Sequence, residues 1–91
     1  MAEPTSEVTV GSTTTAVLTE NPNRSYALFI NDSDETIYLN IGGAAVANDG
    51  IRLNANGGAY EMSRMNGNLD TQAVNAICAS GSKNLLVVEY P

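Results

Sequence analysis

Turn-forming residues recur along this chain and leave no room for a long helix. Gly, Asn, Asp and Pro interrupt it every 8–12 residues or so. The segments between these turns alternate apolar and polar side chains or are rich in Val, Ile and Thr, which favour the pleated backbone. No apolar period of the helical kind is sustained. The pattern therefore predicts an all-β protein.

The spacing of the turns predicts about eight short strands. In 91 residues this number favours a compact two-sheet antiparallel β-sandwich or a jelly-roll-like barrel. Met1–Ser6 is polar, contains Pro4 and is expected to form a flexible N-terminal arm, with residues 7–91 as a single domain. The predicted strands are Glu7–Val10, Thr14–Thr19, Ser25–Asn31, Thr36–Ile41, Ile51–Leu53, Ala59–Ser63, Thr71–Ala79 and Asn84–Tyr90.

Two of these segments, Ser25–Asn31 and Leu85–Val88, are apolar on both faces. One interpretation is that they lie in the middle of their sheets and loops cover them. The other is that one sheet face or edge docks onto another subunit. A chain this short buries only roughly 60% of the surface that its unfolded form exposes. Oligomerisation or docking is therefore a plausible source of further stability.

The net charge of the chain disfavours two classes of partner. Ten acidic residues against four basic residues give a net charge of -6, which disfavours both nucleic acid and anionic membrane surfaces. No apolar run is long enough for a membrane helix, and Met1–Val10 lacks the features of a signal peptide. We therefore expect a protein made in a cytoplasm that stays there or leaves by a route such as virus assembly.

The sequence offers no catalytic or cofactor-binding pattern. Histidine is absent, so the usual nucleophile–base pairs are excluded, and we expect no enzyme. The spacing of Asp32, Asp34 and Glu35 raises the possibility of calcium binding, but the glycine and distal glutamate of a calcium loop are missing. A solvated hairpin tip and no metal site are expected there. Cys78, the single cysteine, is expected to pack as a small apolar side chain.

Contacts with a partner protein are expected from five side chains. Tyr38 alternates with the apolar residues of its strand and is the best candidate for a contact outside the domain. Tyr26 and Phe29 lie in one of the two strands that are apolar on both faces. Val8 and Val10 lie in Met1–Val10, which fits an extended arm that could add a strand to a neighbour's sheet.

The stretch from Asn21 to Glu89 resembles a group of short proteins found in phage and prophage genomes. The shared motifs are N-P-N-R-x-Y at Asn21–Tyr26 and then I-x-N-x-S-D-x-x-I-Y-L near Ile30–Leu39, which matches with a shift of one residue. The series continues with G-G-A-A-V at Gly42–Val46 and G-I-R-L at Gly50–Leu53, and closes with an approximate S-G-x-x-N-L-x-V-x-E at Ser80–Glu89. These motifs are structural and carry no catalytic residues.

The resemblance implies a structural protein of a tailed bacteriophage virion, made in the cytoplasm of the bacterial host. Such a protein would decorate or cement the capsid through multivalent protein–protein contacts. Its expected partner is the major capsid protein or another virion protein, and a homo-oligomer is expected. The alternatives are a receptor- or glycan-binding module associated with a tail or fibre and, less favoured, a small regulatory protein acting on an enzyme.

Overall fold

The structure, a computed structural model, describes residues 4–91 and consists of eight strands joined by turns and loops. No helix occurs in this part of the chain, and so none that could span a membrane. The strands are β1 (Thr5–Val10), β2 (Thr15–Leu18), β3 (Tyr26–Asn31), β4 (Ile37–Ile41), β5 (Ile51–Leu53), β6 (Ala59–Ser63), β7 (Val74–Cys78) and β8 (Lys83–Tyr90).

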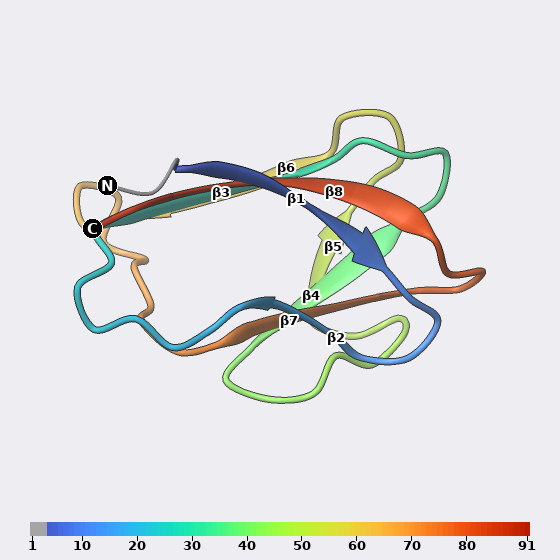
Figure 1. Ribbon diagram of the computed structural model, residues 1–91, viewed down its shortest axis with the longest axis horizontal. Helices are drawn as coiled ribbons and strands as arrows, with labels where there is room; N and C mark the ends of the chain where they lie inside the picture. Colours follow the sequence, from blue (N-terminus) through green and yellow to red (C-terminus); the bar gives the residue numbers. More distant parts are fainter. Residues whose placement is uncertain (1–3) are drawn as a thin grey trace.

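The strands form two antiparallel sheets of four that pack face to face (Figure 1). Sheet A has the order β1-β8-β3-β6, and sheet B has the order β2-β7-β4-β5. Strand β1 therefore pairs with β8, β2 with β7, β3 with β6 and β4 with β5. These are the pairs of one long antiparallel hairpin of eight strands that is folded into two layers. This is the strand order of a jelly roll, so the prediction of an all-β, two-sheet antiparallel sandwich is confirmed.

Strand β1 begins earlier than the sequence predicts. Thr5 and Ser6, which were expected in the flexible arm, are paired with Val88 and Val87 of β8. The prediction of an arm over Met1–Ser6 is therefore wrong at Thr5 and Ser6, because backbone pairing with β8 extends the strand through these polar residues. Met1–Glu3 lie outside the described residues.

The core lies between the two sheets and is built from one face of each strand. Phe29, Leu85 and Val87 from sheet A are fully or almost fully buried against Ile37, Leu39 and other residues of sheet B. Cys78 is buried among them as expected, and its thiol donates to the backbone oxygen of Val10 at 3.3 Å. Among the described residues, the buried cluster between the sheets consists of Val10, Ala27, Phe29, Ile37, Leu39, Leu53, Met62, Val74, Ala76, Cys78, Leu85 and Val87.

A buried arginine connects the segments at one end of the sandwich. Arg24 lies in the β2–β3 connection and has no solvent exposure. Its Nε donates to Glu89 of β8 at 2.7 Å, and its two terminal nitrogens donate to the backbone oxygens of Thr19, Asp70 and Gln72 at 2.8–2.9 Å. The rigid fork of the guanidinium suits this set of four acceptors in a way that a lysine ammonium cannot. Arg24 thereby holds the β2–β3 and β6–β7 connections against the end of β8.

Replacing Arg24 with Ala is expected to lower the free energy of unfolding by about 3–5 kcal/mol, because it leaves a partly buried carboxylate and three carbonyl groups without their partner. Arg24→Lys should recover only part of this loss. Urea unfolding followed by circular dichroism measures both. As a matched control, Arg52→Ala removes an exposed arginine and should change stability by less than about 0.5 kcal/mol. A loss below about 1 kcal/mol for Arg24→Ala would contradict this role.

Candidate functional site

The outer face of sheet A carries a block of apolar side chains in its two central strands. Strands β3 and β8 pair so that Leu28 lies opposite Val88 and Ile30 lies opposite Leu86. Because successive side chains alternate between the two faces of a strand, these four residues point away from the core. Tyr26 and Tyr90 continue the block at one end, with ring centroids 5.9 Å apart. These six residues are named here the apolar patch.

The members of the apolar patch are accessible to a partner. Leu28, Ile30, Leu86 and Val88 are half-buried, because neighbouring side chains on the same face cover part of each one. Tyr90 is 43% exposed. In Figure 1 no described segment crosses the middle of this face. An apolar centre with aromatic side chains at its end is the composition typical of the core of a protein–protein interface.

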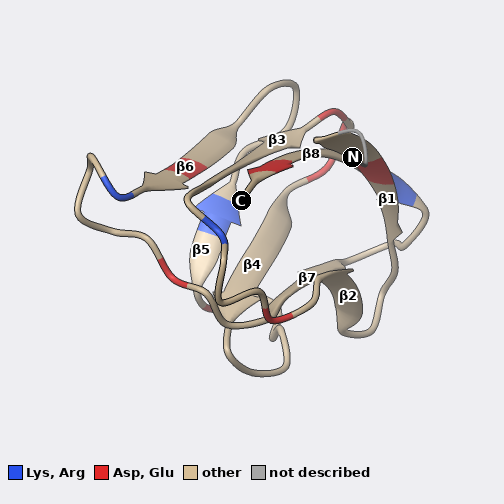
Figure 2. Ribbon diagram, turned by 60° about the vertical axis from the view of Figure 1, so that its left-hand side comes forward, with Lys and Arg blue, Asp and Glu red and all other residues tan. Residues whose placement is uncertain are grey.

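The two outer strands surround the apolar patch with polar and acidic residues. Glu7 of β1 lies beside Leu86, and Glu61 of β6 lies beside Leu28, as follows from the strand register. Figure 2 shows these acidic positions on β1 and β6. The Tyr26 hydroxyl donates to Glu61 at 2.6 Å, and this hydrogen bond raises the pKa of Tyr26 above its usual value. The face is therefore apolar at its centre and negative at two of its margins.

The outer face of sheet B is different, because the long β4–β5 connection lies over it (Figure 1). Polar side chains of sheet B hold this connection in place. The amides of Asn40 and Asn75 donate to the backbone oxygens of Ala44 and Gly43 at 2.8 and 2.7 Å, and the Tyr38 hydroxyl donates to Asn48 at 3.0 Å. Sheet B thus uses its outward polar side chains within the domain. Sheet B also turns one apolar side chain of its central strands outward, Ile77, which lies opposite Tyr38. Sheet A is the sheet whose central strands present a continuous block of apolar side chains on the outer face.

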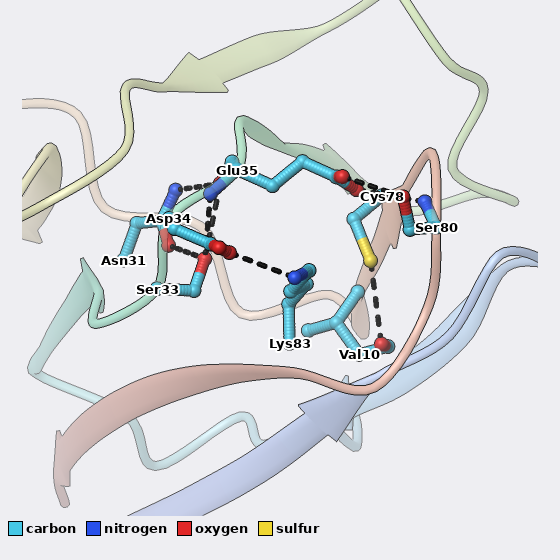
Figure 3. Close-up of polar contacts among 8 residues, drawn as sticks. All are labelled: Val10, Asn31, Ser33, Asp34, Glu35, Cys78, Ser80 and Lys83. Atoms are coloured by element: carbon cyan, nitrogen blue, oxygen red, sulfur yellow. Dashed lines mark hydrogen bonds and ion pairs between the residues drawn. The ribbon is translucent and has the colours of Figure 1, made fainter.

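The acidic segment between β3 and β4 is bonded to the β7–β8 hairpin (Figure 3). Asp34 forms an ion pair with Lys83 at 2.7 Å, and the Glu35 carboxylate accepts hydrogen bonds from the backbone and side chain of Ser80, both at 2.7 Å. These carboxylates therefore connect two loops at one end of the sandwich. Among residues 4–91 there is no group of three or more His, Cys, Asp or Glu side chains arranged to hold a metal ion.

The five predicted contact residues lie in different parts of the molecule. Tyr26 belongs to the apolar patch, and Tyr38 lines a shallow polar depression on sheet B together with Asn48, Asp49, Gly50 and Arg52. Phe29 and Val10 are fully buried in the core, so the prediction that they contact a partner is wrong. Val8 is half-buried and packs against the core from the inner side of β1.

Sequence reasoning identified the two strands of the apolar patch but not which of their residues face outward. It also missed Met65, which is 96% exposed in the loop that follows β6. Ser63, the last residue of β6, pairs with Tyr26, so this loop leaves sheet A near the tyrosine end of the patch. A flexible, polarizable Met is a side chain well suited to adaptable contacts. No signal in the sequence separated it from any other loop residue.

None of the protein-family models, curated proteins or solved structures with which the chain was compared matches it. Its function is therefore argued from the surface of the molecule and from the sequence resemblance described above.

The contacts of Glu35 predict a specific dependence of stability on pH. Hydrogen bonds from Ser80 lower the pKa of Glu35 below its ordinary value of 4.5. A carboxyl group whose pKa is lower in the folded state stabilises the fold above its unfolded pKa, and this contribution disappears as the pH falls through the folded pKa. We expect Glu35→Gln to be less stable than the wild type at neutral pH and to lose less stability on acidification below 4.5.

Urea unfolding at a series of pH values measures this difference. Ser80→Ala should give a smaller change of the same sign, because the Ser80 backbone donor remains. If the stability curves of wild type and Glu35→Gln run parallel through the acid range, the Glu35–Ser80 contact does not hold the two loops together.

Proposed function

We propose that this chain is a structural protein of a tailed bacteriophage virion that decorates or cements the capsid by docking the outer face of sheet A onto capsid protein. The observation that supports this most strongly is the apolar patch on a sheet face with acidic margins. The resemblance of Asn21–Glu89 to phage and prophage proteins is the reason to propose a phage virion as the place where this face docks. Jelly rolls occur in viral capsid domains, but also in lectins and cupins. The proposal therefore rests on the surface of the domain and not on its fold.

The chemistry of the patch indicates what it would bind. Its centre would cover an apolar surface of the partner, and removal of that surface from water would supply affinity. Glu7 and Glu61 at its margins would face basic residues of the partner, since a buried contact between like charges is costly. With a net charge of -6, the chain would be steered toward a positively charged capsid region. Binding should therefore weaken as salt concentration rises.

Repetition of the contact over a capsid lattice would raise the overall binding affinity above that of a single copy. Each copy offers one small face, and linked copies bind far more tightly than single ones because later contacts form at high effective concentration. A homo-oligomer would add to this effect. The proposal places the chain in the virion after synthesis in the cytoplasm of the host.

A second candidate function is recognition of a receptor or glycan as part of a tail or fibre. The depression on sheet B favours it, because Tyr38 presents an aromatic ring beside the polar side chains of Asn48, Asp49 and Arg52. Such sites combine apolar contact with a few placed polar groups. This depression lies on the opposite sheet from the apolar patch, so substitutions can separate the two functions.

The paired substitution of Leu86 and Val88 by Thr tests the first proposal. Threonine keeps the preference for a strand while it removes apolar surface. Affinity for purified capsids of the phage or prophage that encodes the chain should fall on the order of tenfold to a hundredfold. Co-sedimentation with capsids measures this, and thermal unfolding of the free variant checks that it folds.

The matched control is Val46→Thr, which makes the same kind of change at a residue that is 55% exposed in the connection over sheet B. It should leave capsid binding unchanged. Absence of binding by the wild-type chain would contradict the proposal. Binding to immobilised glycans that is lost in Tyr38→Ala and kept in the Leu86/Val88 variant would favour the second candidate.

A further inference from the structure

The free edge of β1 presents a row of backbone groups without partners in sheet A. The backbone N–H of Glu89 donates to the carbonyl of Pro4 at 2.9 Å, so Pro4 directs its carbonyl toward β8. In an antiparallel ladder the residues that bond the neighbour alternate with residues that do not. Ser6 and Val8 therefore bond β8, and the N–H and C=O groups of Thr5, Glu7 and Thr9 point to the opposite side. No other described strand pairs with β1.

The part of this edge whose backbone groups are unpaired ends before Gly11. Gly11 is the next residue in the outward series, and its carbonyl accepts a hydrogen bond from the Cys78 N–H of β7 at 3.1 Å. The chain there crosses from sheet A to sheet B. Thr5, Glu7 and Thr9 are all exposed. The edge thus offers three donors and three acceptors to an extended segment.

The other edge strands of the described sheets are protected. At β6 two of the outward backbone groups are already bonded, because the Asn68 side chain accepts from the Ser63 N–H at 3.0 Å and donates to the Glu61 carbonyl at 2.9 Å. In sheet B, β5 has three residues, and β2 has four with a register shift between Ala16 and Leu18. Short strands, bulges and capped edges are the features by which proteins avoid unwanted strand pairing. The six residues of β1 carry none of them.

Pairing of β1 with a second copy of itself is unfavourable. In an antiparallel pair that uses Thr5, Glu7 and Thr9 of both copies, Thr5 lies opposite Thr9 and Glu7 lies opposite Glu7. Two like charges directly opposite each other destabilise a strand pair. A shift of the register by two residues removes this repulsion but leaves fewer outward residues paired. The charge at the centre of the edge therefore favours a different chain with a base at that position.

We propose that β1 accepts an extended strand from a partner protein, with a Lys or Arg opposite Glu7 on the outer face of sheet A and apolar side chains at the alternate positions on the inner face, beside the half-buried Val8. The added strand would make sheet A five-stranded and would place its outward side chains on the docking face described above. Backbone hydrogen bonds would supply affinity, and the side chains would supply specificity. This inference rests on the proposed function only for the identity of the partner, because the edge can be tested with peptides.

A display library of random extended peptides about ten residues long, selected on the full chain, is the probe. The enriched peptides should alternate apolar residues and carry Lys or Arg. Proline at position 7 removes the central outward N–H without breaking a bond to β8, and edge strands tolerate proline. Affinity should be about tenfold or more lower in Glu7→Pro than in Glu7→Ala, which removes the same charge but keeps the N–H. Thermal unfolding of both variants confirms that they fold.

Amide hydrogen exchange on the full chain gives a second measurement of the same edge. Selected peptide should slow exchange at Thr5, Glu7 and Thr9, whereas Ser6 and Val8 should be protected already in the free chain. The proposal is overturned if no peptide is enriched, if Glu7→Pro binds as well as Glu7→Ala, or if the three amides stay unprotected in the complex.

The two proposals fail in different ways. Capsid binding by the wild type and Glu7→Pro alike, with no peptide enriched, would overturn strand addition and leave the capsid proposal standing. Peptide binding that depends on the Glu7 N–H, with no capsid binding, would support strand addition and overturn the virion function.

Discussion

The pairing of β8 with β3 is the interaction on which the rest of the molecule depends. These two strands form the centre of sheet A, and their register places Phe29 and Val87 side by side in the core. The same register places Leu28 opposite Val88 on the outer face. Because side chains alternate strictly along a strand, a pair of strands whose central residues are apolar on both faces must expose an apolar surface on one side. Sheet A therefore combines the centre of the fold with the surface proposed to bind a partner.

Many of the polar side chains form hydrogen bonds or ion pairs within the domain. Arg24 at one end and the contacts of Asp34 and Glu35 at the other connect loops that are distant in sequence. Asn31 is fully buried and its amide donates to the Leu53 carbonyl, which links β3 of sheet A to β5 of sheet B. Every buried side-chain nitrogen and oxygen in residues 4–91 has a hydrogen-bond partner. These contacts fix the ends of the sandwich, while the outer face of sheet A and the edge of β1 remain available.

The sequence predicted the strands and the two-layer architecture well, because turn residues and apolar alternation are local signals. It could not decide which face of β3 is buried, because Leu28 and Phe29 are both apolar and only the register with β8 separates them. For this reason the sequence predicts a partner contact for Phe29, although this residue lies in the core. The burial of Arg24 depends on acceptors from two distant segments, at Asp70 and Gln72 in the β6–β7 connection and at Glu89 of β8. Such long-range contacts leave no pattern in a single sequence.

Electron cryo-microscopy of capsids incubated with the purified chain tests the central claim most directly, because it reveals which face of the domain meets the capsid. The outer face of sheet A, with Leu86 and Val88, should lie against capsid protein, and the β4–β5 connection over sheet B should face solvent. A bound domain in the opposite orientation, with the depression around Tyr38 against the capsid and the apolar patch exposed, would contradict this claim.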